Sequence, residues 1–264
     1  MEILGYVLAI VMGFTLGLLG GGGSILTVPI LVYVLAIDPI LATAYSLFVV
    51  GTTSVVGAAR KSMEGLVDWK TGLIFAVPSL IAVFFTRYTL VPAIPDELFT
   101  IGGFLFTKQI AIMVFFAIVM LLAAYSMIKG RKEQSEEHKK PLNIPMILLE
   151  GLIVGTVTGL VGAGGGFLIV PALVLLVGLR MKVAVGTSLI IIAIKSLIGF
   201  LGDLGSGQAI DWNFLLIFTA FSAVGMFLGI YATKFVKPAV LKKGFGWFVL
   251  AMGIFILLKE TVLK

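Results

Sequence analysis

Two glycine-rich stretches of this chain match each other at a constant offset of about 142 residues. The first runs from Gly13 to Pro29 (GFTLGLLGGGGSILTVP) and the second from Gly155 to Pro171 (GTVTGLVGAGGGFLIVP). Most of their glycines and their final proline coincide, so the chain is a duplicated unit and its fold must hold two copies. Each glycine run lies between two apolar segments that are too short for comfortable membrane spans. We therefore predict a hairpin of broken helices in each half.

Composition indicates the class of protein to which the duplicated unit belongs. Of the residues, 60% are hydrophobic and 12% are charged, and the mean hydropathy is +1.18. A soluble domain cannot bury that much apolar surface, and long unbroken apolar runs are typical of helical spans and not of a membrane barrel. We predict an all-α integral membrane protein. The absence of cysteine excludes disulfides and thiol chemistry.

Basic residues cluster in four short stretches between the apolar segments, and they contribute to a formal charge of +6. These stretches begin at Arg60, Lys129, Arg180 and Lys234. Because an excess of Lys and Arg marks cytoplasmic loops, the clusters indicate the positive-inside rule and exclude nucleic acid as the expected partner. The chain is predicted to lie in the cytoplasmic (inner) membrane, with both termini outside.

The charged stretch 129–143 is predicted to be a cytoplasmic linker between two transmembrane repeats, 1–128 and 144–264. Each repeat contains an odd number of apolar segments, so the two copies face opposite ways, as in an inverted-topology repeat. The first two segments of each repeat either cross the membrane or form a re-entrant hairpin, which leaves about 8–10 transmembrane segments. The last apolar segment of the first repeat runs over 98–128, with Lys108 snorkelling near its outer end, and we expect the true span to start near Ile110.

The glycine runs are the first candidate binding site. Glycine lets the backbone approach a ligand and adopt φ > 0, and Ser24 stands where it would cap the helix that follows. Unpaired amides and the positive end of a helix dipole suit an anion. The candidate substrate-binding residues of the two hairpins are Gly20, Gly21, Gly22, Gly23 and Ser24, then Gly162, Gly164, Gly165 and Gly166. The alternative is that these glycines only allow close helix packing, as small residues do in membranes.

A single lysine lies deep in an apolar segment of the second repeat. Lys195 stands about thirteen residues after the start of the segment at Val183, near the bilayer centre, where a lysine costs roughly 2.5–3.5 kcal/mol. Such a residue needs a partner or a water-filled cavity. We favour coordination of an anion by Lys195, and the alternatives are an ion pair with Glu150 and snorkelling to the interface.

Small and polar residues share the helical stripe of Lys195 and the matching stripe of the first repeat. Further candidate binding residues on these two helices are Tyr45, Ser46, Thr53, Thr187 and Ser188. Their hydroxyls can donate hydrogen bonds to an oxyanion, although helical Ser and Thr often bond the backbone instead. Two recurring dipeptides, Asp68-Trp69 and Asp211-Trp212, precede spans in the two halves. Each predicts a helix cap followed by an interfacial aromatic residue.

No constellation of residues predicts an enzyme. The sequence has a single histidine, His138, in the charged linker, and its glycine runs lack the Lys-Ser/Thr of a phosphate-binding loop. No clustered metal-ligand set is present, so we expect no cofactor and no metal. Because no ATPase motif appears, uphill transport would use a proton or cation gradient.

The paired stretches Gly20 to Pro29 and Gly162 to Pro171 carry a resemblance to a known family. Together with ATAYS at 42–46 and AVGTS at 184–188, they make the chain similar to the sulfite exporter TauE/SafE family. The resemblance covers essentially the whole chain and implies a permease for sulfite, sulfoacetate or related organosulfur anions. It leaves the substrate and the direction of transport open.

The residues and the resemblance together predict a secondary transporter, an exporter by resemblance, of a small sulfur-containing oxyanion such as sulfite or an organosulfonate. Alternating access about a midplane site, coupled to an ion or proton gradient, is the expected mechanism. The alternatives are a passive anion channel, a carrier for another small solute and a membrane scaffold without transport. The expected partners are the anion, the coupling ion and the lipid bilayer, and a homodimer stays open.

Overall fold

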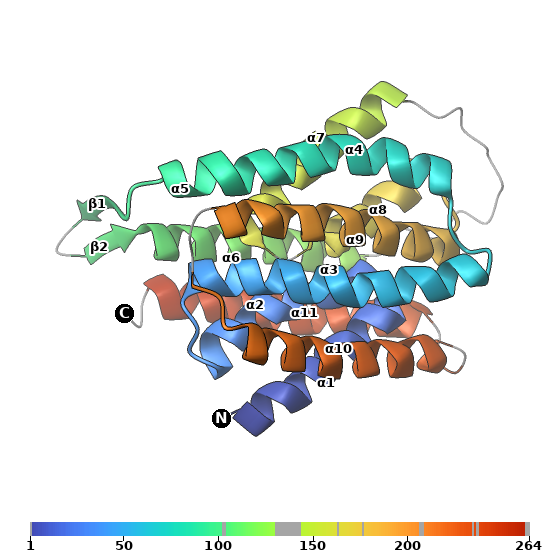
Figure 1. Cartoon of the computed structure of the whole chain (residues 1–264), viewed down its shortest axis with the longest axis horizontal. Helices are drawn as coiled ribbons and strands as arrows, with labels where there is room; N and C mark the ends of the chain where they lie inside the picture. Colours follow the sequence, from blue (N-terminus) through green and yellow to red (C-terminus); the bar gives the residue numbers. More distant parts are fainter. Residues whose placement is uncertain are drawn as a thin grey trace.

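The protein is a bundle of long helices, seen in a computed structural model that describes residues 2–101, 104–129, 144–162, 164–175, 177–205, 209–233, 235 and 238–261 (Figure 1). The first half contains α1 (Glu2–Leu19), the 3-10 helix η1 (Gly21–Leu26), α2 (Thr27–Pro29), the π-helix η2 (Ile30–Val34), α3 (Pro39–Met63), α4 (Trp69–Phe85), the π-helix η3 (Thr86–Leu90), α5 (Val91–Ala93), the strands β1 (Glu97–Ile101) and β2 (Phe104–Thr107), and α6 (Lys108–Lys129). The second half contains α7 (Ile144–Val161), α8 (Gly166–Leu175), α9 (Met181–Gly205), α10 (Trp212–Ala232) and α11 (Pro238–Thr261). Apart from Lys129, the predicted linker 129–143 and its His138 lie outside the described residues.

Six helical stretches of the described chain are long and apolar enough to cross a membrane. They are Pro39–Met63, Trp69–Ala93, Lys108–Tyr125, Ile144–Val161, Met181–Leu204 and Trp212–Ala232, and two shorter apolar helices are Ile3–Leu19 and Gly23–Val34. Large hydrophobic side chains such as Phe85, Leu122 and Tyr231 point outward with more than half of their surface exposed, which is suited to lipid. The chain is therefore an all-α integral membrane protein, as predicted. The total of about 8–10 segments stays a prediction.

A short β-hairpin forms the first part of one predicted apolar segment. β1 pairs antiparallel with β2, and the rings of Phe99 and Phe106 stack with their centroids 4.8 Å apart. The helix begins only at Lys108, whose backbone N–H donates to the Asp96 carbonyl oxygen at 3.0 Å. The apolar run at 98–128 is thus a helix only from Lys108, close to the expected start of the span near Ile110, and its earlier strands contain Phe, Thr and Ile, which favour a strand. The Lys108 side chain is buried at the start of α6.

Aspartates begin three of the long helices. Asp68 accepts a hydrogen bond from the Thr71 N–H at 3.0 Å, and Asp211 accepts one from the Phe214 N–H at 3.1 Å. These bonds satisfy amides that have no partner within the helix. The two predicted caps are confirmed. Asp38 caps α3 in the same way.

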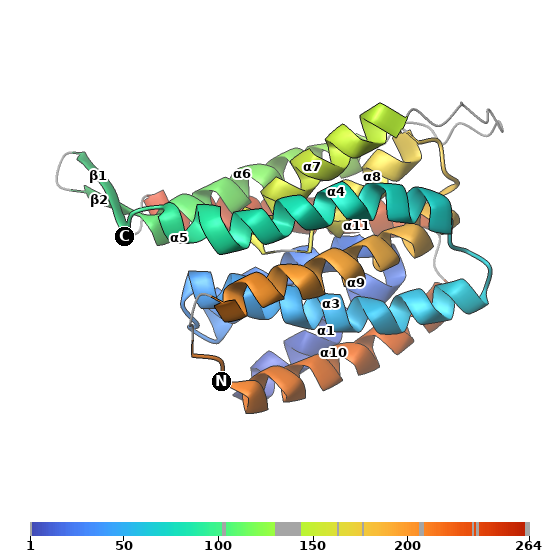
Figure 2. The same cartoon turned by 45° about the horizontal axis from the view of Figure 1, so that its top comes forward.

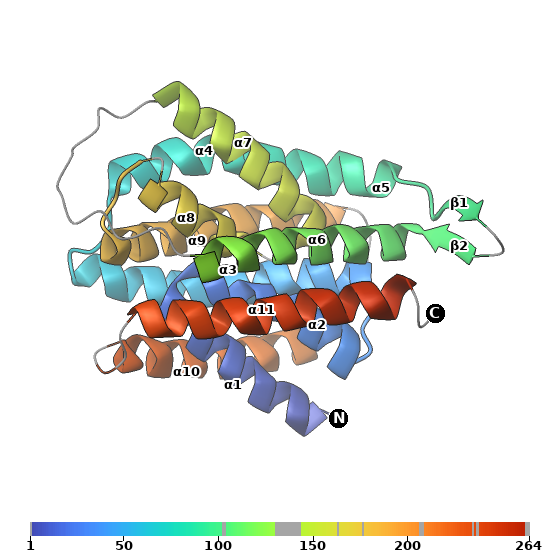
Figure 3. The same cartoon turned by 180° about the vertical axis from the view of Figure 1, so that it is seen from behind.

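Helices at equivalent positions of the two halves have equivalent neighbours. α1 packs along α10 as α7 packs along α4, while α3 lies beside α9 and α6 beside α11 (Figures 2 and 3). Matching glycines allow the closest approaches, because a Cβ on Gly13 would lie 1.9 Å from the Ser222 carbonyl oxygen and one on Gly155 would lie 2.4 Å from that of Ser79. Each first helix therefore packs against a helix of the other half through small residues.

The two ends of the bundle differ in what they carry. Both termini lie toward the end that carries β1 and β2, and the turn between α3 and α4 lies at the other end (Figures 1 and 3). The predicted topology puts the end that carries β1 and β2 outside and the basic turn after Arg60 in the cytoplasm. Which end faces the cytoplasm stays a prediction.

Candidate functional site

Both glycine runs break a helix at matching positions. α1 ends at Leu19 and Gly20 has φ 69°, while α7 ends at Val161 and Gly162 has φ 71°. A residue with a Cβ adopts this left-handed conformation at a cost, so glycine suits both points. After the break, the chain continues as η1 in the first half and as α8 in the second. The predicted broken-helix hairpins are thus present in both halves.

The two hairpins touch each other in the middle of the bundle. A Cβ on Gly21 would lie 1.9 Å from the Gly166 Cα, and a Cβ on Gly166 would lie 1.9 Å from the Gly21 Cα. The Ile192 Cδ1 atom is also close to both positions. Backbone therefore meets backbone here, and at this point the glycines serve the close packing that the alternative interpretation predicted.

Each hairpin also rests on the long helix of the other half. A Cβ on Gly20 would lie 2.9 Å from Val185 Cγ1, on α9, and one on Gly162 would lie 2.4 Å from Thr43 Cβ, on α3. Val185 and Thr43 are separated by the same offset as the two glycines. The hairpins are thus held by α3 and α9, which carry the other candidate binding residues.

Lys195 lies against the second hairpin. Its side chain is 0% exposed, and its Nζ donates a hydrogen bond to Thr158 Oγ1, on α7, at 3.0 Å. The same nitrogen would lie 2.7 Å from a Cβ built on Gly165. Glycine at position 165 therefore leaves the space that the ammonium group occupies. The sequence correctly singled out this lysine as fully buried in a span, and the structure excludes snorkelling.

Two backbone amides belong to Gly165, which the ammonium group adjoins, and to Gly164, the residue before it. Gly164 and Gly165 have φ of 64° and 68°, and their N–H groups donate to no acceptor among the described residues. Orphan amides in a turn with positive φ can hold an anion. A lysine and two glycine amides thus lie together in a part of the protein from which the described side chains exclude solvent.

Several hydroxyls near the middle of α3 and α9 also have no partner. Within the described residues, the side chains of Ser46, Thr53, Ser54 and Ser196 are buried without a hydrogen bond. Thr53 stands at the position of α3 that matches Lys195 on α9. A buried polar group without a partner is costly, so these hydroxyls are candidates for contact with water or a ligand.

Glu150 does not pair with Lys195. Between described residues, the ion pairs are those of Glu64 with Arg60 and Lys61 and of Arg87 with Asp203. Both carboxylate oxygens of Glu150 are buried without a hydrogen-bond partner in that part of the chain. The alternative explanation of Lys195 as the partner of Glu150 is therefore wrong, because their charged groups are not in contact.

Tyr45 and Thr187 serve as acceptors at the helix caps. The Tyr45 hydroxyl oxygen accepts from the Asp211 N–H at 2.7 Å, and Thr187 Oγ1 accepts from the Asp68 N–H at 2.9 Å. The two contacts are equivalent in the two halves. Thr187 precedes Lys195 by eight residues on α9, about 12 Å along the axis. The structure therefore does not bring these two side chains together with the lysine.

Two of the three candidate serines, Ser24 and Ser188, donate to backbone carbonyl oxygens three residues earlier in the chain. Ser24 Oγ donates to the Gly21 carbonyl oxygen at 2.7 Å, and Ser188 Oγ donates to that of Val185 at 2.8 Å. The N-cap of η1 is Gly20, so the prediction that Ser24 caps a helix was wrong. Gly22 and Gly23 lie within η1, and Gly23 packs against the Leu16 backbone of α1.

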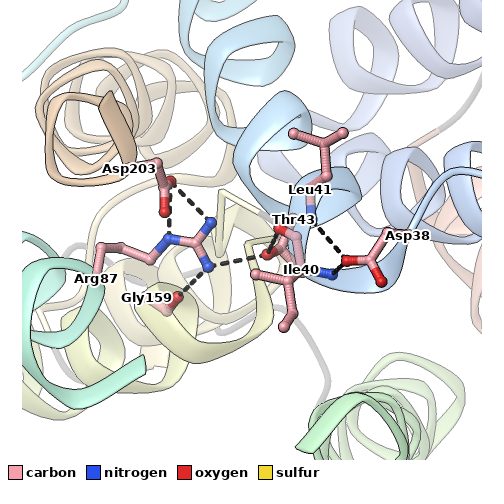
Figure 4. A network of polar contacts seen from close by, with 7 residues as sticks. All are labelled: Asp38, Ile40, Leu41, Thr43, Arg87, Gly159 and Asp203. Carbon is pink, nitrogen blue, oxygen red and sulfur yellow. Dashed lines mark hydrogen bonds and ion pairs between the residues drawn. The ribbon is translucent and has the colours of Figure 1, made fainter. Parts of the chain in front are cut away.

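Figure 4 shows a buried ion pair that the sequence analysis missed, between Arg87 and Asp203. Arg87, on η3, is 1% exposed and its Nε donates to Asp203 Oδ2, on α9, at 2.9 Å. Its Nη1 donates to Thr43 Oγ1 at 2.9 Å and to the Gly159 carbonyl oxygen at 3.3 Å. An arginine inside an apolar segment was the available signal, since such residues are rare and mark functional positions. The described residues contain no group of His, Cys, Asp and Glu that could hold a metal ion.

Comparison with known proteins identifies the family. Residues 6–256 match the family described as Sulfite exporter TauE/SafE. A "Probable membrane transporter protein" of Xylella fastidiosa (strain 9a5c) is 30% identical over 93% of this chain and 90% of its own length. The like-named protein of Haemophilus influenzae is 27% identical over 94% of each chain, and "Probable membrane transporter protein YunE" of Bacillus subtilis is 29% identical over 80% and 82%. No solved structure matches the chain. The chain belongs to the TauE/SafE family and is a membrane transporter.

Proposed function

We propose that this TauE/SafE transporter carries a small sulfur-containing oxyanion, such as sulfite or an organosulfonate, and that Lys195 binds it. The observation that carries the proposal is the placement of the Lys195 ammonium group. It is fully buried in a span, pairs with no carboxylate among the described residues, and lies beside the Gly165 backbone. An uncompensated lysine at this depth costs roughly 2.5–3.5 kcal/mol, and an anion offsets that cost.

The chemistry of the surrounding groups favours an oxyanion over other solutes. Lys195 supplies up to three N–H donors, of which one is directed to Thr158. The amides of Gly164 and Gly165 are further donors, and the hydroxyl of Thr53 is available on the facing helix. Donors around a single positive charge fit a small group with several oxygens and one or two negative charges. The family description supports sulfite or a related sulfur compound as this group.

The contact between the hairpins suggests how access alternates. Gly21 and Gly166 are in backbone contact, so a route to Lys195 between the two glycine hairpins would open only when the hairpins shift. Movement of one repeat against the other would expose the site first on one side and then on the other. A proton or cation gradient would drive net export, since the sequence contains no nucleotide-binding motif.

A ligand screen followed by flux measurement tests the proposal. Purified protein is screened by thermal shift against sulfite, methanesulfonate, sulfate and acetate, and sulfite flux is then measured in liposomes. The proposal expects stabilisation by sulfite or the sulfonate, saturable flux, and dependence of the flux on an imposed proton or cation gradient. Flux that does not saturate would identify a channel. Stabilisation and saturable flux of an uncharged solute alone would identify another carrier, and no flux of any solute would identify a scaffold.

A further inference from the structure

The Arg87–Asp203 pair joins the two halves at one end of the bundle. Arg87 belongs to η3 in the first half and Asp203 to α9 in the second, and both side chains are buried. The arginine also holds Thr43 on α3 and the Gly159 carbonyl oxygen on α7, so four segments converge on one guanidinium group (Figure 4). This end carries the β1–β2 hairpin and is predicted to face outside.

Two nitrogen atoms of the Arg87 guanidinium group share one oxygen atom of the Asp203 carboxylate. Nε lies 2.9 Å and Nη2 lies 2.8 Å from the same oxygen, Oδ2 of Asp203. Nη2 makes no hydrogen bond of good geometry within the described residues. The strongest pairing of arginine with an oxyanion instead uses two parallel bonds to two oxygens. Arg87 therefore retains capacity to bind an oxyanion that presents two oxygens.

The repeat shows that the fold does not require this pair. The position equivalent to Asp203 in the first half is Lys61, at an offset of 142. The helices α4 and α10 match at an offset of 143, as their caps Asp68 and Asp211 do, so the position equivalent to Arg87 in the second half is Ile230. Gly17 of the first half packs against the Ile230 backbone of the second half. In the same way, Gly159 of the second half packs against Thr86 of the first half. One half thus forms the equivalent packing without an ion pair. Because a buried pair gives little net stability, a role beyond folding is indicated.

The pair and Lys195 contact neighbouring residues of α7, although Asp203 lies eight residues beyond Lys195 on α9, about 12 Å along the axis. Lys195 donates to Thr158, and Arg87 donates to the carbonyl group of the next residue, Gly159. Thr43, the other acceptor for Arg87, touches Gly162 of the second hairpin. Two buried cations from different helices therefore hold the same hairpin. An anion that moved from Lys195 along α9 toward the end that carries β1 and β2 would approach Arg87.

We propose that Arg87 is a second oxyanion-binding residue of the pathway and that Asp203 occupies it until the transported anion takes its place. Displacement of Asp203 releases α9 from η3 and opens the end of the bundle that carries the β-hairpin. This inference rests on the proposed function, because it needs an oxyanion as the transported species. The ligand class is the same, a small sulfur oxyanion with at least two oxygens.

Neutralisation of each partner has opposite predicted effects on binding. Asp203→Asn removes the competing charge and should tighten sulfite binding about tenfold, the factor expected if the pair is open about a tenth of the time. Arg87→Gln should weaken binding at least as much and stop flux. If the pair only stabilises the fold, both variants should instead lose stability, and neither should gain affinity. Failure of Asp203→Asn to tighten sulfite binding would overturn the inference.

A double variant without charge keeps the test valid if single variants fold poorly. Arg87→Met/Asp203→Leu replaces the pair with apolar groups of similar size, which buried ion pairs often tolerate without loss of stability. We expect this protein to fold, to bind sulfite more weakly than wild type and to lack flux. Wild-type flux in the double variant would show that Arg87 binds no transported anion.

A cysteine pair tests the opening itself without touching Arg87. A Cβ built on Gly199 lies 3.8 Å from the Val83 Cβ, which is the usual separation in a disulfide, and the chain has no cysteine of its own. Oxidised Val83→Cys/Gly199→Cys should lose sulfite flux and regain it on reduction, while the Val83→Cys single variant stays active in either redox state. Full flux in the oxidised protein would show that α4 and α9 need not separate. If wild type binds sulfite and these tests fail, the role of Arg87 is refuted and the proposed function is not. If wild type neither binds nor transports any oxyanion, both the proposed function and the role of Arg87 are refuted.

Discussion

Gly21→Ala tests the contact between the two hairpins. Gly21 lies in η1 without positive φ, so the substitution adds a methyl group and little backbone strain. That methyl carbon would lie 1.9 Å from the Gly166 Cα and 2.5 Å from the Gly166 carbonyl carbon. Ordinary contact begins at 3.4 Å, so the hairpins would have to separate by more than 1 Å. Because the obstacle is backbone, no side-chain rotation relieves it.

The expected cost follows from overpacking. Extra methyl groups in a well-packed core cost about 1–3 kcal/mol, and the upper part of that range applies where two backbones meet. In a chain of this size, the midpoint of thermal unfolding falls by about 2–4 °C per kcal/mol, so a cost of about 2–3 kcal/mol should lower it by about 4–12 °C. Sulfite flux should fall as well, because the hairpins must shift about this contact to open the proposed route to Lys195.

Thermal unfolding in detergent and sulfite flux in liposomes provide the measurements. Gly244→Ala is the matched control, since a Cβ there meets nothing within 4 Å and the residue lies in α11. The control should be neutral or slightly stabilised, because alanine favours a helix over glycine by about 1 kcal/mol. Unchanged stability and full flux in Gly21→Ala would refute the hairpin contact.

Three further predictions concern sidedness and helix caps. A cysteine at Met63 should be labelled from the cytoplasmic side and one at Glu97 from outside, and labelling of both from one side would contradict the topology. Tyr45→Phe removes the acceptor for the Asp211 N–H and should cost about 1 kcal/mol of stability in thermal unfolding. Sulfite affinity should be unchanged, and a large loss of affinity would place the Tyr45 hydroxyl in the binding site. Asp38→Ala removes the cap of α3 and should cost about 1 kcal/mol in the same assay, and an unchanged midpoint would show that the cap contributes nothing.

Much of the arrangement could be predicted because the chain repeats itself. The offset between Gly20 and Gly162 located both helix breaks, and hydropathy located Lys195 in a span. The aspartate caps were also evident, since Asp before an apolar run is a strong local signal. Local sequence patterns were thus sufficient for features that depend on a single segment, such as a helix break, a helix cap or a lysine within a span.

Contacts between distant segments could not be predicted in the same way. Nothing local to Arg87 indicates that Asp203, 116 residues later in the chain, lies beside it. Tyr45 and Thr187 have the composition of binding residues, yet their hydroxyls accept from cap residues of the opposite half. Strand-forming residues at 98–107 were hidden within an apolar run. In each case the deciding partner lies far away in the sequence.

Titration of sulfite into wild-type protein and Lys195→Met tests the central claim most directly. Methionine keeps the length of the side chain and removes the charge that adjoins Gly165. Lys108→Met is the matched control, because Lys108 is another buried lysine and lies at the start of α6, away from the two glycine hairpins. We predict that Lys195→Met weakens sulfite binding at least about tenfold, equivalent to about 1.4 kcal/mol, while Lys108→Met binds as wild type does. Unchanged sulfite affinity in a folded Lys195→Met protein would contradict the account.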